Sequence, residues 1–130
     1  MTTSTIVLDA SAVLAFLNKE PGYPVVSDYL AAGCAMSAVN LAEVAYKLAA
    51  IGVPPKQVQT FLDLMGIEVC ALTAEHAIQI AQMKPAAKAY GLSLADLACL
   101  ALGKQLLLPV LTADRVWEQT DYGIEIVLIR

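Results

Sequence analysis

Charged residues are scarce in this 130-residue chain. They make up 15% of it, whereas hydrophobic residues make up 58%. A disordered chain has the opposite composition, so we expect a packed globular fold of the size of one domain. Basic residues number 8 and acidic residues 12, which gives a net charge of −4. This balance argues against tight nonspecific binding of nucleic acid through bulk positive charge, although it allows an enzyme that gathers its acids around a metal ion.

Cysteine and histidine are also sparse. The cysteines Cys34, Cys70 and Cys99 are odd in number and form no Cys-x-x-Cys motif, and His76 is the single histidine. We therefore find no support for a disulfide framework or a Cys/His zinc site, and we expect buried free thiols. A single histidine excludes acid–base catalysis by a histidine pair. We expect His76 at the surface or in a supporting position rather than in catalysis.

Uninterrupted apolar runs of membrane-spanning length are missing. The longest candidate, residues 92–111, contains Asp96, Lys104 and Pro109. The first apolar run contains Asp9 and has no basic stretch before it. We therefore expect neither a membrane span nor a signal peptide, and we expect a cytoplasmic protein. The sequence also has no internal repeat, low-complexity tract or linker.

Short apolar strands alternate with helical segments along the chain. We expect strands at residues 5–9, 34–38, 67–72, 106–112 and 124–129. We expect helices at residues 11–20, 24–32, 39–50, 54–66, 73–90, 93–102 and 113–119. We expect Pro85 to kink or break the helix at residues 73–90, and Gly103 to end the helix at residues 93–102. This alternation predicts a single α/β domain, residues 1–130, whose parallel sheet is covered on both faces and is apolar throughout.

Four acidic residues lie where predicted strands end or helices begin. Asp9 and Asp114 follow strands, Glu43 lies on the helix after the second strand, and Asp96 lies at the start of a helix. Each is explained singly as a helix cap. Asp9 and Asp114 are candidate N-caps, and the segments "NLAE" (40–43) and "SLAD" (93–96) resemble capping boxes.

Taken together, the four acids predict a shared site. Ligands of an open parallel sheet bind beyond the carboxyl ends of its strands, so these carboxylates can converge on one edge. Converging carboxylates repel one another and resist desolvation unless a cation neutralises them. Oxygen ligands suit Mg²⁺ or Mn²⁺, and such ions polarise a phosphoryl oxygen and activate water. All four are therefore candidate metal ligands and catalytic groups.

The blocks that carry these acids resemble the PIN-domain ribonucleases, and among them the VapC-type toxins of toxin–antitoxin pairs. The likeness covers nearly the whole chain and rests on "VLDASAVLAFL", "SAVNLAEVAYKL", "GLSLADLACLALG" and "LPVLTADRVW". It implies a three-layer fold with sheet order 3-2-1-4-5, the four acids as ligands of Mg²⁺ or Mn²⁺, and Ser11, Asn40 and Thr112 as polar helpers. It implies cleavage of single-stranded or looped RNA that inhibits translation, a homodimer and a cognate antitoxin. Because some relatives carry a further acid, Glu118 and Asp121 stay open candidates.

The remaining residues have simpler explanations. We expect Trp117 in the core and Lys47 in an ordinary helix pair with Glu43. Candidate phosphate contacts, each also explained as surface charge, are Lys84, Lys88 and Arg115. Setting the four acids aside leaves eight acidic residues against the 8 basic ones, so the rest of the surface need not repel RNA.

Other functions stay open at this point. One is a non-catalytic α/β binding domain whose acids are only caps, and another is a PIN nuclease that processes RNA without an antitoxin. An aspartyl phosphatase would need Asp-x-Asp, whereas this chain has Asp9-Ala10-Ser11. The sequence also lacks the acidic pair and the late lysine of a phospho-acceptor receiver, and it has no Gly-x-Ser-x-Gly motif of a serine hydrolase.

Overall fold

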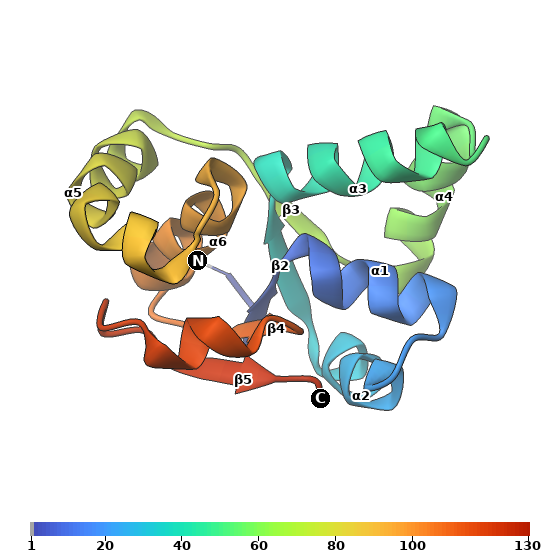
Figure 1. The fold of residues 1–130 in the computed structure, drawn as a ribbon. Coiled ribbons are helices and arrows are strands. Elements are labelled where there is room, and N and C mark those ends of the chain that lie inside the picture. The colour runs from blue at the N-terminus through green and yellow to red at the C-terminus, as the bar shows by residue number, and fades with distance from the viewer. Residues whose placement is uncertain (1) are drawn as a thin grey trace.

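The computed structural model describes residues 2–130 and shows a five-stranded sheet between two layers of helices (Figure 1). The strands lie in the order β3-β2-β1-β4-β5, and all neighbouring pairs are parallel. Their bounds are β1 Ile6–Leu8, β2 Cys34–Ser37, β3 Glu68–Cys70, β4 Val110–Thr112 and β5 Ile126–Leu128. The predicted α/β class and the strand order 3-2-1-4-5 are confirmed.

Helices cover both faces of the sheet, as predicted. One layer consists of α1 (Ala10–Asn18), α2 (Tyr23–Ala32), α3 (Ala38–Ala50) and α4 (Pro55–Met65). The other consists of α5 (Ala74–Tyr90) and α6 (Leu94–Leu106), together with the short 3₁₀ helix η1 (Arg115–Gln119). Figure 1 shows the second layer on the left and the first on the right. Among residues 2–130, no helix is both long and apolar enough to cross a membrane.

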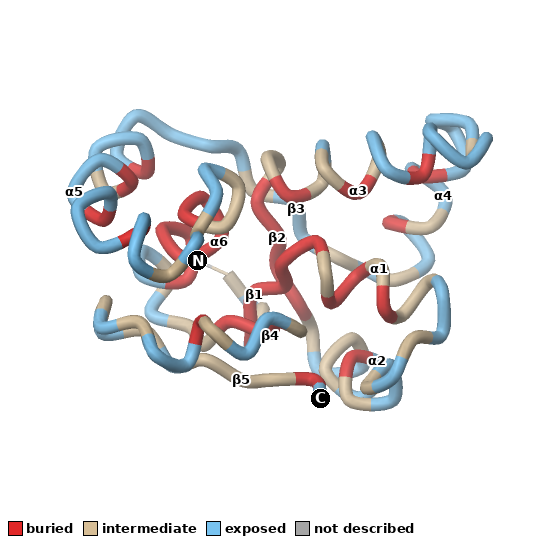
Figure 2. Tube along the Cα trace, viewed as in Figure 1, coloured by how far each residue is buried: buried red, intermediate tan, exposed pale blue. Residues whose placement is uncertain are grey.

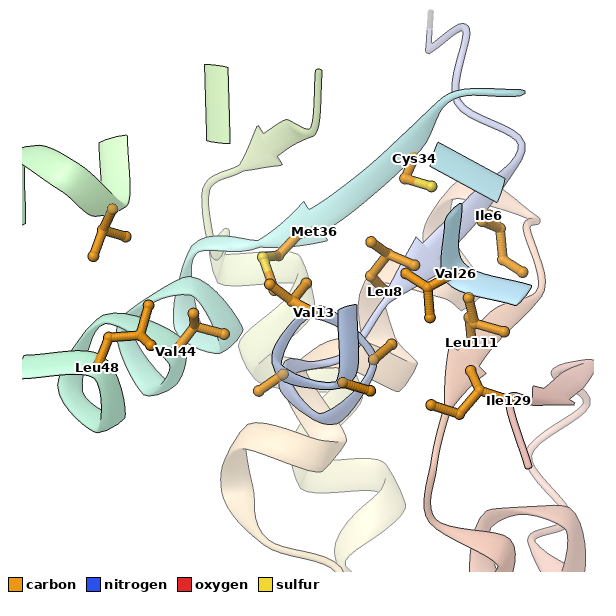
Figure 3. Packing of buried hydrophobic residues seen from close by; sticks show 14 residues of the cluster. Ile6, Leu8, Val13, Val26, Cys34, Met36, Val44, Leu48, Leu111 and Ile129 are labelled. Carbon is orange, nitrogen blue, oxygen red and sulfur yellow. The ribbon is translucent and has the colours of Figure 1, made fainter. Parts of the chain in front are cut away.

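The three central strands are apolar except for Ser37 and Thr112 at the ends of β2 and β4, because both faces of the sheet are covered. Every residue of β1, β2 and β4 is buried (Figure 2). Ile6 and Leu8 face the layer of α1 to α4, as Figure 3 shows, whereas Val7 faces the layer of α5 and α6. Trp117 is fully buried in that second layer, which confirms its predicted place in the core. The edge strands β3 and β5 are only partly covered.

Two residues that were expected to interrupt helices do not do so. Pro85 lies inside α5, which continues unbroken from Ala74 to Tyr90. Gly103 lies inside α6, which ends three residues later at Leu106. The strand predicted from residue 106 therefore begins only at Val110, because Leu106 is helical and Leu107 is the left-handed C-cap with φ 56°.

His76 was expected at the surface or in a supporting position, and the surface alternative is wrong. It is buried at the start of α5, where its backbone N–H donates to Thr73 Oγ1 and its Nδ1 accepts from the Thr73 N–H. Its Nε2 contacts Gln105 Oε1 on α6. His76 is therefore a structural cap that ties α5 to α6. Cys34 and Cys99 are buried free thiols as predicted, while Cys70 is partly exposed.

Candidate functional site

Asp9 occupies the carboxyl end of the central strand β1. It is the N-cap of α1, and its Oδ1 accepts a hydrogen bond from the Ala12 N–H at 2.9 Å. The Ser11 hydroxyl donates to both carboxylate oxygens, at 2.7 and 2.9 Å, and the Thr112 hydroxyl donates to Oδ2 at 2.6 Å. The side chain is thus fixed by three donors from two elements, and the residue is only 5% exposed.

Ser11 and Thr112 connect Asp9 to the end of the neighbouring strand β4. The Thr112 hydroxyl accepts from the Asp114 N–H at 3.0 Å, and the Ser11 hydroxyl accepts from the Ala113 N–H at 3.0 Å. Asp114 is exposed and is the N-cap of η1, accepting from the Val116 N–H at 3.1 Å. Both hydroxyl groups therefore orient Asp9 and hold the turn that carries Asp114.

The Asp9 carboxylate is costly to keep ionised. Burial raises the pKa of Asp9 from 3.8 to about 6, although the hydrogen bonds from Thr112, Ala12 and Ser11 each lower it. The negative charge of Asp96 raises it further. A proton or a cation near Asp9 would relieve this cost, since either neutralises the buried charge.

A buried asparagine positions the other two acids. Asn40, in the first turn of α3, donates from Nδ2 to the Ala95 carbonyl of α6 at 3.0 Å, which places the starts of the two helices side by side. Asn40 is 1% exposed, and its Oδ1 has no hydrogen-bond partner. The capping box expected at residues 40–43 is wrong, because the N-cap of α3 is Ser37. Within residues 2–130 Glu43 caps no helix, and it forms the predicted pair with Lys47 at 3.8 Å.

Asp96 lies at the start of α6 and forms the predicted capping box with Ser93. The Ser93 N–H donates to Asp96 Oδ2 at 2.9 Å, and the Asp96 N–H donates to Ser93 Oγ at 3.1 Å. One turn later, burial raises the pKa of the Cys99 thiol well above its usual range, and the charges of Asp9, Asp96 and Glu43 raise it further. The charges of three of the four acids therefore act on one buried thiol.

The fourth acid, Asp114, joins this group through its backbone bond to Thr112. All four residues lie at the edge of the sheet where the parallel strands end. Within the described part of the chain, however, no three Asp, Glu, His or Cys side chains lie close enough to hold one ion together. The acids line an open edge and do not form a closed cage.

This donor set fits a hard cation that is held by one or two carboxylates at a time. Mg²⁺ is commonly bound in that way, with water and substrate phosphate completing its shell. Three donor groups contact the Asp9 carboxylate, from Ser11, Ala12 and Thr112, and an ionised carboxylate has about four acceptor sites, so about one site is left for a cation. The unpartnered Oδ1 of Asn40 adds an oxygen acceptor beside the acids.

Other candidates from the sequence stand apart from this group. Glu118 and Asp121 are exposed, and no contact joins them to the four acids in residues 2–130. The basic candidates Lys84, Lys88 and Arg115 are exposed on α5 and η1. The sequence predicted a buried Cys99 but not its place near the acids, although Cys99 follows Asp96 by about one turn on the same apolar helix.

Several solved structures share this fold. The VapBC2 complex of Rickettsia felis, bound to a DNA fragment from its promoter, has a chain with a TM-score of 0.75 and 17% identity, covering 95% of this chain and 98% of that chain. DNA-bound VapBC from Salmonella typhimurium has a chain with a TM-score of 0.73 and 19% identity, and the match covers 97% of this chain and 98% of that chain. FitAcB from Neisseria gonorrhoeae has a chain with a TM-score of 0.69 and 22% identity, and the match covers 94% of this chain and 96% of that chain. At these identities the likeness establishes the fold alone.

The sequence itself settles the family. It matches none of the curated proteins. The family model of the PIN domain, however, matches residues 6–122, a span that begins at β1, ends beyond η1 and includes all four acids. With that match over most of its length, the chain belongs to the PIN domain family.

Proposed function

We propose that this protein is a metal-dependent endoribonuclease and the toxin of a toxin–antitoxin pair. It acts in the cytoplasm, hydrolyses phosphodiester bonds in single-stranded or looped RNA, and thereby inhibits translation. Family membership supports a nuclease, and the structural neighbours from VapBC and FitAcB complexes support the toxin role. The proposal assigns metal binding and catalysis to Asp9, Glu43, Asp96 and Asp114.

The observation that carries the proposal is the buried Asp9 carboxylate next to two other acids. A fold that needed only a helix cap at this position could use Ser, Thr or Asn without a buried charge. Asp9 instead keeps a carboxylate at 5% exposure, where the charge of Asp96 makes ionisation harder. Glu43 adds a third acid that capping does not explain. Such an arrangement suits a site whose negative charge is neutralised by a bound cation.

Capping and metal binding are compatible at these residues. Asp9, Asp96 and Asp114 each accept one hydrogen bond from a backbone N–H group, and an ionised carboxylate can accept about four. The caps fix the orientation of each side chain, so little conformational entropy is lost when a ligand arrives. The alternative of a purely non-catalytic domain with capping acids therefore gains no support from the caps alone.

The residues of the chain divide the work of hydrolysis as follows. Mg²⁺ or Mn²⁺, when bound, supplies positive charge for the phosphate and activates water. Ser11 and Thr112 hold Asp9 in one orientation through its hydrogen bonds. Asn40 fixes the start of α3, which carries Glu43, against the start of α6, which carries Asp96. No histidine takes part, because His76 is engaged with Thr73 and Gln105.

Contacts with other chains complete the proposal. Large apolar side chains stay exposed in the single chain, among them Leu64 (81%), Ile78 (63%) and Leu94 (70%). Exposed apolar surface of this kind favours association. We propose a homodimer and a cognate antitoxin as its partners. A strict monomer in sedimentation, combined with no protein co-purifying from an operon-based co-expression, would contradict this part of the proposal.

The nuclease activity is tested with purified protein and a labelled RNA that contains a hairpin loop and a duplex stem. Cleavage should occur in the loop with Mg²⁺ or Mn²⁺ and stop on chelation. Asp96→Asn keeps the fold but should lose most activity, since one negative ligand is removed. Asp63→Asn is the matched control, because Asp63 is an exposed carboxylate on α4 whose one contact is with Gln59. Equal cleavage by wild type and Asp96→Asn would refute the assignment.

A further inference from the structure

The outer face of α3 carries an exposed aromatic side chain next to one of the proposed ligands. Tyr46 is 80% exposed, and the Lys47 side chain is 57% exposed. They follow Glu43 by three and four residues, so each is a neighbour of Glu43 on the helix surface. The proposed site therefore has an aromatic ring and a cation directly beside it.

Neither side chain is needed by the fold. The buried stripe of α3 consists of Asn40, Val44 and Leu48, and Tyr46 lies outside it. Lys47 makes one ion pair, with Glu43 at 3.8 Å, and an exposed pair of this kind contributes little to stability. The Tyr46 ring is almost fully exposed and is therefore free to stack on a ligand.

This face of α3 borders the acids and not a remote part of the surface. Asn40 of α3 donates to the Ala95 carbonyl of α6, and Glu43 follows Asn40 by three residues on the same side of the helix, so Glu43 lies toward α6. Figure 1 shows α3 running outward from the sheet edge, with its start nearest β2. Tyr46 and Lys47 thus lie one turn farther out than Glu43, along the same helix.

We propose that Tyr46 stacks on an unpaired base of the RNA and that Lys47 contacts a phosphate of the same strand. The inference rests on the proposed nuclease function and names the residues that select single strands. Proteins that bind single strands combine aromatic platforms for the bases with positive charge for the backbone. Bases within a duplex are already stacked on one another, so they offer Tyr46 no face. Selectivity for loops follows from this contact.

The test measures binding apart from cleavage. Fluorescence anisotropy is recorded with Mg²⁺ for a short uridine-rich single strand and for the same strand with abasic sugars in place of its central nucleotides. Tyr46→Ala should weaken binding of the normal strand by at least about fivefold, the low end of the contribution of one stacked base. It should change binding of the abasic strand by less than about twofold, while Tyr46→Phe, which keeps the ring, should bind both strands as the wild type does. Lys47→Met should weaken both strands and flatten the salt dependence.

Tyr23→Ala serves as the matched control, since Tyr23 is also exposed (37%) but begins α2 in another part of the molecule. Sedimentation of each variant shows whether Tyr46 instead serves contact between two copies. Equal binding of the normal strand by Tyr46→Ala and wild type, or dissociation of a dimer without a change in RNA affinity, would overturn the inference. Cleavage that persists alongside such a result leaves the nuclease proposal standing. Tyr46-dependent binding without any cleavage refutes the nuclease and leaves the stacking contact.

Discussion

Replacing Asp9 by Asn should stabilise the metal-free protein at neutral pH. Asn keeps a side-chain oxygen for the Ala12 N–H, so the cap of α1 survives. It removes a negative charge that burial disfavours, as the raised pKa of Asp9 shows. A change in a proposed catalytic residue would thus increase the free energy of unfolding, which is the mark of a site that sacrifices stability for function.

The magnitude follows from the pKa. The pKa of Asp9 is about 6 in the folded state against 3.8 for the free side chain. The difference is about 2 units at about 1.4 kcal/mol each, so the charge destabilises the folded state by about 3 kcal/mol at neutral pH. Asn cannot accept from both the Ser11 and Thr112 hydroxyl groups as the carboxylate does. This loss lowers the stability of the variant by about 1 kcal/mol. The expected net gain is about 2 kcal/mol.

The pH dependence of the free energy of unfolding tests the direction of this effect. The folded state binds the Asp9 proton more tightly than the unfolded chain does. The contribution of Asp9 to stability is therefore greatest below pH 3.8 and is lost as the pH rises through about 6. Urea unfolding with a chelator present should show a clear advantage of Asp9→Asn at about pH 7.5 that shrinks by about 2 kcal/mol at about pH 4.5.

Asp63→Asn is the control for this measurement. It makes the same chemical change at an exposed position and should alter the free energy of unfolding by less than about 0.5 kcal/mol at either pH. If Asp9→Asn is no more stable than wild type at neutral pH, or if its advantage does not shrink on acidification, the Asp9 charge is not costly and the reasoning fails.

Three further outcomes are expected. Gly103→Ala should lower the free energy of unfolding by about 1–3 kcal/mol in denaturant titrations, because the new Cβ would lie 2.6 Å from Cγ2 of the buried Val110; an increase in stability would contradict this packing. Asn40→Ala should cost about 1–3 kcal/mol in the same assay, since the Ala95 carbonyl loses its donor, and an unchanged midpoint would mean that this bond is dispensable. In the native protein a thiol reagent should modify partly exposed Cys70 first, and Cys34 and Cys99 only on unfolding; early labelling of Cys99, checked by mass spectrometry, would contradict its burial beneath the acids.

Much of the architecture could be predicted because it follows from local patterns. The central strands are short, apolar and separated by turn signals, and each leads into a helix, so the parallel sheet followed directly. Asp9 and Asp96 were identified as both cap and site residue, and the structure confirms both caps. The strand order came from the family resemblance, since strand pairing depends on tertiary contacts that spacing alone does not reveal.

The misplaced boundaries came from residues whose role depends on packing. Gly103 was expected to end a helix, yet its missing side chain lets β4 approach α6, where Val110 occupies the space of a Cβ. Pro85 was expected to disturb α5, but α5 packs along α6 and remains one helix on both sides of Pro85. His76 was expected at the surface or in a supporting position, and only the fold shows that it replaces an acidic side chain in a capping box. Local propensity cannot report such contacts.

The most direct test of the central claim is whether the acids at the sheet edge bind a divalent cation. Mn²⁺ binding is measured by electron paramagnetic resonance, which counts free ions, in wild type, Asp9→Asn, Asp96→Asn and the exposed control Asp63→Asn. Saturable binding should occur in wild type and Asp63→Asn and should be strongly weakened in the other two, since each loses one negative ligand. Equal binding by all four proteins, or none by the wild type, would show that Asp9 and Asp96 are helix caps and nothing more.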